Sequence, residues 1–99
     1  MMKLEWSPDA LDDLDTIYEI IALDDEDTAM RFISQLQEKA RNLLDSPRIG
    51  VIIEELDNES FREFHYKGYT IIYEIQRNAI RIHEVYNQRR IFIRTYRKQ

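Results

Sequence analysis

The stretch GYTIIYEIQRNAIRIHEVYNQRR, residues 68–90, decides the fold of this 99-residue chain. Two runs within it, YTIIYEI and AIRIHEVY, alternate apolar residues with others, which is typical of half-buried β-strands. QRN between the runs predicts a turn. Upstream, SFREFHY predicts a further strand that ends at a turn of Lys67 and Gly68, and GVIIEEL predicts a strand or an extended lead-in. We therefore expect a meander of antiparallel strands.

The two turns predict which residues face each other across the strands. A two-residue loop of Lys67 and Gly68 pairs Tyr66 with Tyr69, Phe64 with Ile71 and Arg62 with Tyr73. A second loop of Arg77 and Asn78 pairs Glu74 with Arg81, Tyr73 with Ile82 and Ile72 with His83. The opposite charges of Glu74 and Arg81 favour this second register, since such a cross-strand pair contributes about 0.2–1 kcal/mol.

Before Pro47 the apolar residues follow a helical period instead. Ser7 and Pro8 predict a helix start, because a serine hydroxyl caps free N–H groups and proline suits the first helical position. The apolar stripe of this first helix is Ala10, Leu11, Leu14, Ile17, Tyr18 and Ile21, and that of a second is Ala29, Phe32, Ile33, Leu36, Ala40, Leu43 and Leu44. DDEDT separates the stripes, and Pro47 should end the second helix. The sequence predicts a helical hairpin preceded by a short strand, KLEW, with Trp6 in the core.

Length and composition narrow the function classes. A chain of 99 residues is expected to form one domain, residues 1–99, that folds without disulfides. It has no cysteine and only two histidines, so we expect no metal site and no cofactor. No apolar run approaches the roughly 20 residues of a membrane span, and the N-terminus lacks the features of a signal peptide. We therefore expect a cytoplasmic protein without membrane contact.

The charge is distributed unevenly along the chain. Residues 1–60 carry 5 Lys or Arg against 16 Asp or Glu, whereas residues 61–99 carry 9 against 3, and the formal net charge is -5. A basic half suggests a surface for nucleic acid or for an acidic protein. The acidic half argues against a protein that coats DNA over its whole surface. The alternative is that the charges only solvate the fold.

The order of a strand, two helices and then antiparallel strands is similar to that of the RelE/ParE family of toxins. The residues that carry the resemblance are SPDALDDLDTIYEII, LLDSPRIG, EELDNESFREF, GYTIIYEI and IRIHEVYNQRR. The resemblance covers nearly the whole chain, and the order and spacing of the segments are more specific than any one of them. It implies an α+β fold in which an N-terminal strand and a helical hairpin pack on a twisted antiparallel sheet.

The resemblance implies a toxin that a cognate antitoxin neutralises, in a hetero-oligomer of the two proteins. ParE-like members inhibit DNA gyrase, whereas RelE-like members cut messenger RNA on the ribosome. Two departures from the nuclease pattern favour the ParE-like reading. Thr70 stands where many nuclease members carry a second arginine, and Asn87 stands where a histidine is frequent. An amide cannot exchange protons near neutral pH as an imidazole can. Whether the chain is an enzyme stays open, as does a third alternative, a member that only binds antitoxin.

Candidate site residues gather at the basic, aromatic end of the chain. As target-binding residues we expect Arg62, Tyr86, Asn87, Arg89, Arg90 and Tyr96. If the protein is a nuclease, the catalytic candidates are Arg62, Arg89, Arg90 and Tyr96, because arginine stabilises phosphate charge and tyrosine can transfer a proton or stack on a base. Each has an alternative: Arg62 could stack on Tyr73, and the doubled arginine could be solvation. We expect His83 and His65 to be packing or surface residues.

Overall fold

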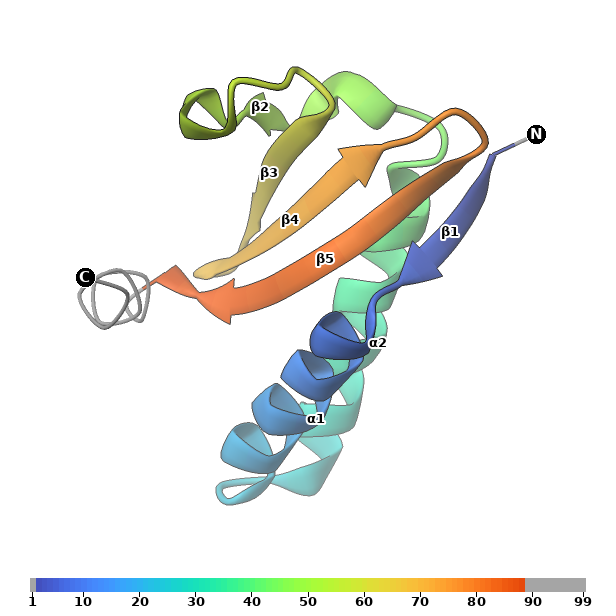
Figure 1. Ribbon diagram of the computed structural model, residues 1–99. Coiled ribbons are helices and arrows are strands. Elements are labelled where there is room, and N and C mark those ends of the chain that lie inside the picture. Colours follow the sequence, from blue (N-terminus) through green and yellow to red (C-terminus); the bar gives the residue numbers. More distant parts are fainter. Residues whose placement is uncertain (1, 89–99) are drawn as a thin grey trace.

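The computed structural model describes residues 2–88 (Figure 1). Its strands are β1 (Lys3–Trp6), β2 (Val51–Ile52), β3 (Phe61–Tyr66), β4 (Tyr69–Ile75) and β5 (Ala79–Asn87). Its helices are α1 (Pro8–Ala22), α2 (Glu26–Asn42) and two short 3-10 helices, η1 (Pro47–Ile49) and η2 (Glu54–Leu56). The predicted α+β fold is confirmed. GVIIEEL forms only a two-residue strand, because η2 follows at once.

All five strands join one sheet in the order β1-β5-β4-β3-β2. The meander of β3, β4 and β5 is antiparallel as predicted, and β1 pairs in parallel with β5, so the complete sheet is mixed. The Lys67 and Gly68 loop has the predicted register. Both of its residues have positive φ, 47° and 83°, which matches the tight hairpin turn whose twist suits antiparallel strands.

The register between β4 and β5 departs from the prediction at one residue. Glu74 faces Arg81 and Tyr73 faces Ile82 as predicted, but Ile72 faces Glu84 and not His83. His83 is the extra residue of a β-bulge. Its backbone carbonyl accepts a hydrogen bond from the Ser7 hydroxyl at 2.9 Å, so the bulge forms where β5 meets the start of α1.

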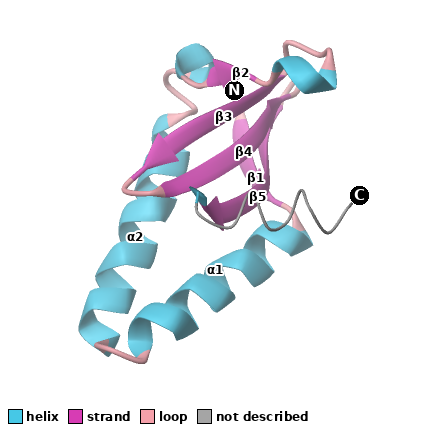
Figure 2. Ribbon diagram, turned by 90° about the vertical axis from the view of Figure 1, so that its left-hand side faces the viewer, coloured by secondary structure: helices cyan, strands magenta, loops and turns pink. Residues whose placement is uncertain are grey.

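Both main helices begin at side-chain caps. The Ser7 hydroxyl accepts a hydrogen bond from the backbone N–H of Ala10, and the Asp25 carboxylate accepts one from that of Thr28. Figure 2 shows the helices diverging from the loop that joins them, with the sheet across the open side of this V. Most residues of the predicted stripes lie in the core or pack against it, whereas Leu11 is 50% exposed and Tyr18 is only partly buried outside the core cluster. Trp6 is partly buried and packs against the core.

The sheet has one face toward the helices and one open face. Successive cross-strand rows of residues point alternately to the helix-covered face and to the open face. Tyr66 and Tyr69 lie on the helix side, where both rings contact Phe32 of α2. The helix side also holds Ile71, Tyr73, Ile80, Ile82 and Val85, all buried. The open face holds the rows of Phe61, Glu74, Arg81 and Glu5, of Glu63, Ile72 and Glu84, and of His65, Thr70 and Tyr86. Within residues 2–88, neither main helix has the length and apolar content to cross a membrane.

Candidate functional site

The candidate residues fall into two groups. Tyr86 and Asn87 are the last two residues of β5, and Arg62 lies in β3 opposite Tyr73. Arg89, Arg90 and Tyr96 lie outside the described residues. The structure therefore places the end of β5 as the described part of the predicted site. Arg62 lies three cross-strand rows from Tyr86. The row of Phe64 and Val85 and the row of Glu63 and Glu84 lie between them.

Arg62 is tied into the fold. Arg62 is 8% exposed. Its Nη1 atom donates hydrogen bonds to the backbone carbonyls of Arg48 at 3.1 Å and Gly50 at 3.0 Å. The Tyr73 hydroxyl assists by donating to the Pro47 carbonyl and accepting from the Gly50 N–H. Together the two side chains hold the turn of residues 47–50 against the sheet. These contacts hold the guanidinium in the fold, and a role of Arg62 in target binding stays a prediction.

Gly50 is required at this turn by close packing. A Cβ atom built on it would lie 2.5 Å from the Tyr73 hydroxyl oxygen and 2.8 Å from the Glu63 carbonyl oxygen. Real Cβ contacts are not that short, so no side chain fits unless the turn moves.

The Arg62 Nε atom is buried and has no hydrogen-bond partner among the described residues.

Tyr86 faces Thr70 across β4 and β5. Burial raises the pKa of the Tyr86 hydroxyl above its ordinary value of 10.0, the Glu63 carboxylate adds to this rise by repulsion, and Thr70 opposes it. A tyrosine with a raised pKa is protonated at neutral pH. Tyr86 is 6% exposed and stays protonated, and it is therefore a poor general base.

His65 lies at the centre of a polar cluster, whereas the sequence analysis expected it to be a packing or surface residue. Its Nδ1 atom lies 3.1 Å from the Thr70 hydroxyl and 2.6 Å from the Gln88 side-chain nitrogen, and its Nε2 atom lies 3.3 Å from a Glu63 carboxylate oxygen. Because the Gln88 amide N–H only donates, Nδ1 accepts, and a neutral ring carries its proton on Nε2 toward Glu63. The two-residue spacing of Glu63 and His65 on one strand face was the available sequence signal.

Glu63, His65 and Thr70 have the order of an acid, a base and a hydroxyl nucleophile. Thr70 is only 1% exposed, so its hydroxyl cannot reach a substrate. The Gln88 amide also occupies the ring nitrogen that would take the proton from it. We conclude that this cluster holds the open face together and does not carry out nucleophilic catalysis.

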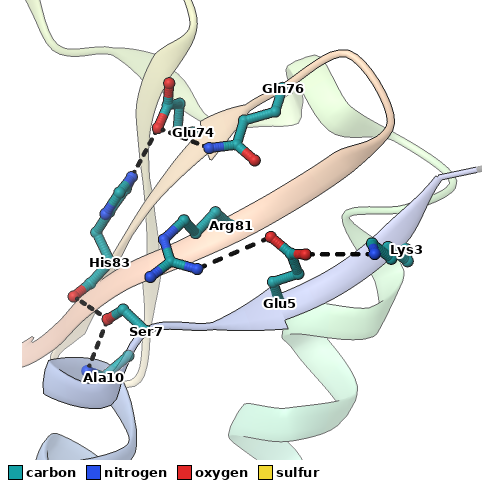
Figure 3. Close-up of polar contacts among 8 residues, drawn as sticks. All are labelled: Lys3, Glu5, Ser7, Ala10, Glu74, Gln76, Arg81 and His83. Carbon is teal, nitrogen blue, oxygen red and sulfur yellow. Dashed lines mark hydrogen bonds and ion pairs between the residues drawn. The ribbon is translucent and has the colours of Figure 1, made fainter.

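His83 forms a second closed contact on the open face. Its Nε2 atom lies 2.8 Å from a Glu74 carboxylate oxygen, which also accepts a hydrogen bond from the Gln76 side-chain amide (Figure 3). The ring stacks on Phe61 with 5.4 Å between centroids. These contacts agree with the predicted packing role of His83.

The open face carries more acid than base. Among residues 2–88 its rows contain Glu5, Glu63, Glu74 and Glu84. The cations beside them are Lys3, 3.6 Å from Glu5, and Arg81, 3.8 Å from the same carboxylate (Figure 3). Nucleic-acid backbones bind through unpaired Lys and Arg. This part of the surface is therefore unfavourable for RNA.

No three His, Cys, Asp or Glu side chains within residues 2–88 are grouped so that they could hold a metal ion. The described part of the candidate site consists of Tyr86 and Asn87 at the end of β5.

The comparisons agree with this architecture. A family model described as ParE toxin of type II toxin-antitoxin system, parDE, matches residues 4–92. The fold is similar to that of a chain in the solved structure "Chromosomal ParDE TA system from P. aeruginosa", with a TM-score of 0.73 and 20% sequence identity. The match covers 88% of this chain and 96% of that chain. No protein with a curated description matches the sequence.

Proposed function

Because the chain belongs to the ParE family of toxins from type II toxin–antitoxin systems, we propose that it acts by inhibiting DNA gyrase. As a member of this family it is the toxin component of its system, and its partner is a cognate antitoxin. The match of the ParE family model over residues 4–92 carries the proposal. We also propose that residues 1–99 form a single domain and that the protein reaches its target, gyrase, in the cytoplasm.

The described chemistry supports binding over catalysis. Messenger RNA cleavage requires a group that removes the 2′-hydroxyl proton, a group that protonates the leaving oxygen and cations for the phosphate charge. Both histidines are engaged by glutamates, and Tyr86 is held protonated by its surroundings. Inhibition by binding requires none of these transfers. It requires a complementary surface, which aromatic and arginine side chains supply well.

We place the gyrase contact at the end of the chain that begins with Tyr86 and Asn87. Arg89, Arg90 and Tyr96 follow them in the sequence and add positive charge and a further aromatic ring. Arg62 supports this contact through the fold, since its guanidinium donates to backbone carbonyls, and a direct contact of Arg62 with the target stays a prediction. An acidic antitoxin segment that covers this end would neutralise the toxin, because it would occupy the same cations.

Removal of the two neighbouring arginines tests this assignment. The double variant Arg89→Ala with Arg90→Ala is expected to lose gyrase inhibition by roughly 100-fold or more, as expected for loss of two hot-spot residues. The matched control is Arg31→Ala with Arg77→Ala, which removes the same charge from two exposed positions outside the end of β5. The measurement is the concentration of purified toxin that halves gyrase supercoiling, with circular dichroism as the check on folding. Equal inhibition by both double variants would refute the assignment.

A further inference from the structure

A basic patch lies where the β3–β4 hairpin meets the middle of α2 (Figure 2). It consists of Gln35 and Lys39 of α2 and of Tyr66 and Lys67 of the hairpin. The ammonium groups of Lys39 and Lys67 lie 5.3 Å and 5.4 Å from the centroid of the Tyr66 ring. Gln35 and Lys67 are exposed, and Lys39 and Tyr66 are half-buried. The basic patch is therefore open to a partner.

The positive charge of the basic patch is not balanced within residues 2–88. Neither Lys39 nor Lys67 forms an ion pair with a carboxylate of that part of the chain. The acidic neighbour of Lys39 in the sequence, Glu38, is paired with Arg41 at 2.6 Å. Two ammonium groups beside one ring repel each other, because like charges raise each other's energy. An anion between them would remove this repulsion.

The groups that the basic patch leaves for a partner are mainly hydrogen-bond donors. The Gln35 side-chain oxygen accepts from the Tyr66 hydroxyl at 3.0 Å and from the Lys67 ammonium group at 3.3 Å. A lysine ammonium group can only donate, so the atom that faces it is the oxygen, and the amide nitrogen of Gln35 is turned away. That nitrogen makes no hydrogen bond among the described residues. The basic patch thus suits a negatively charged acceptor.

The surroundings favour a short acidic segment of a protein over a nucleic acid. DNA binding draws on several phosphate contacts, each with its own cation. The basic patch has two lysines, α2 begins with the acidic residues Glu26 and Asp27, and the formal net charge of the chain is -5. A DNA duplex would meet this negative charge over a wide area, whereas a segment of a few residues would meet only the basic patch. Aspartate and glutamate side chains therefore fit it best.

We propose that an acidic segment of the cognate antitoxin binds at the basic patch. A carboxylate of that segment lies between Lys39 and Lys67 and accepts a hydrogen bond from the amide nitrogen of Gln35. Opposite charges on the two proteins speed their encounter and fix the register of the complex. The antitoxin thereby supplies the anion that residues 2–88 of the toxin do not provide.

The basic patch is continuous with the end of β5. Tyr66 faces Tyr69, and Tyr69 faces Asn87, in one cross-strand row. Neighbouring strands lie about 4.8 Å apart, so this row places Asn87 about 10 Å from Tyr66. About three extended residues span that distance. An antitoxin segment held at the basic patch therefore reaches the end of β5. Its effect on gyrase inhibition rests on the proposed gyrase contact, whereas its binding does not.

A matched pair of variants tests which sign of charge the basic patch binds. Gln35→Glu places a carboxylate inside the basic patch and is expected to weaken binding of the full-length antitoxin roughly tenfold, because it repels an acidic segment and pairs with Lys67. Gln37→Glu adds the same charge about 200° around α2 and should change the affinity by less than about twofold. Isothermal titration calorimetry at low salt measures both dissociation constants, with circular dichroism as the check on folding.

Removal of the cations gives a second, independent test. Lys39→Gln with Lys67→Gln should weaken antitoxin binding roughly tenfold at low salt. The loss should largely disappear at about 1 M salt, where the screening length is about 3 Å. The matched control is Lys3→Gln with Arg77→Gln, which removes the same charge from two exposed positions outside the basic patch. This control should leave the affinity within about twofold of the wild-type value.

Three results would overturn the proposal. The first is equal antitoxin affinity within either matched pair. The second is a loss of affinity that persists at about 1 M salt, because such a loss is not electrostatic. The third is unchanged antitoxin binding together with binding of a random-sequence DNA duplex that Lys39→Gln with Lys67→Gln abolishes, which would assign the basic patch to a nucleic acid. The titrations contain no gyrase, so the antitoxin contact and the proposed gyrase target fail separately.

Discussion

On the helix-covered face of the sheet, β4 contributes Ile71 and Tyr73, both 0% exposed, whereas on the open face the same strand contributes Thr70, Ile72 and Glu74. The first face buries apolar surface against α1 and α2. The second pairs polar groups with each other, Glu63 with His65 and Glu74 with His83. The sheet is thus a scaffold on both faces, by packing on one and by closed polar contacts on the other. We propose that the end of β5 and the residues that follow it in the sequence carry the function.

Neighbouring isoleucines give the largest contrast between the faces. Ile71→Ala removes a fully buried side chain from the core and is expected to lower the free energy of unfolding by roughly 2–5 kcal/mol. Ile72→Ala makes the same change on the open face, where Ile72 is only partly buried, and should lower it by about 1 kcal/mol or less. Urea unfolding of both variants measures the difference. Equal losses would mean that the open face is packed as tightly as the helix side.

Arg62 is an exception to this contrast between the faces, because it is a charged residue in a row of the buried, helix-covered face. Arg62→Ala leaves the carbonyls of Arg48 and Gly50 without their donor, and should cost roughly 2–4 kcal/mol of folding free energy. Arg81→Ala on the open face, whose ion pair with Glu5 spans 3.8 Å, should cost about 1 kcal/mol or less. Gyrase inhibition per folded molecule should stay unchanged in Arg62→Ala. A folded variant that has lost inhibition would give Arg62 a direct part in target binding.

The hydroxyl of Tyr73 adds a pH dependence to the helix side. Tyr73→Phe loses two hydrogen bonds, to Pro47 and from Gly50, and should lower stability by about 1–3 kcal/mol at neutral pH. Burial raises the pKa of Tyr73 above 10.0, so its contribution is present below pH 10 and is lost as the pH rises through the folded-state pKa. The variant should therefore lose stability less steeply above pH 10. Urea unfolding across alkaline pH checks this, and parallel curves would contradict it.

The smallest effect is expected at the edge of the open face. Lys3 pairs with Glu5 at 3.6 Å, and 72% of its side chain is exposed. Lys3→Ala should change the free energy of unfolding by no more than about 0.5 kcal/mol, because such a pair is solvated and screened. Thermal or urea unfolding at low salt is sufficient to measure it. A loss comparable to that of Arg62→Ala would show that the open face contributes strongly to stability.

Local patterns predicted the elements whose causes are local. The Lys67 and Gly68 turn and the two-residue period of the strands determine the register of β3 and β4. The caps at Ser7 and Asp25 determine where the helices begin. The bulge at His83 has a distant cause, because its carbonyl meets Ser7, 76 residues earlier in the chain. The alternation of apolar and polar residues along β5 therefore does not predict that contact.

The sequence identified Tyr86 and Asn87 by their chemical groups, and their part in a site stays a prediction. The structure places them in neighbouring cross-strand rows on opposite faces of the sheet, Tyr86 with Thr70 and Asn87 with Tyr69. The structural role of Arg62 was missed because its partners are backbone carbonyls of a turn 12 and 14 residues away. Sequence alone identifies the side chain but not the carbonyls that fold back toward it. The His65 cluster was missed because it needs β3, β4 and Gln88 together.

We propose that this toxin inhibits gyrase by binding and does not cleave RNA. The most direct test of this proposal is supercoiling by purified DNA gyrase titrated with folded, antitoxin-free protein, with parallel samples that contain programmed ribosomes and messenger RNA. We expect inhibition of supercoiling, reversal by the cognate antitoxin and intact messenger RNA. Unimpaired gyrase together with ribosome-dependent RNA cleavage would contradict it.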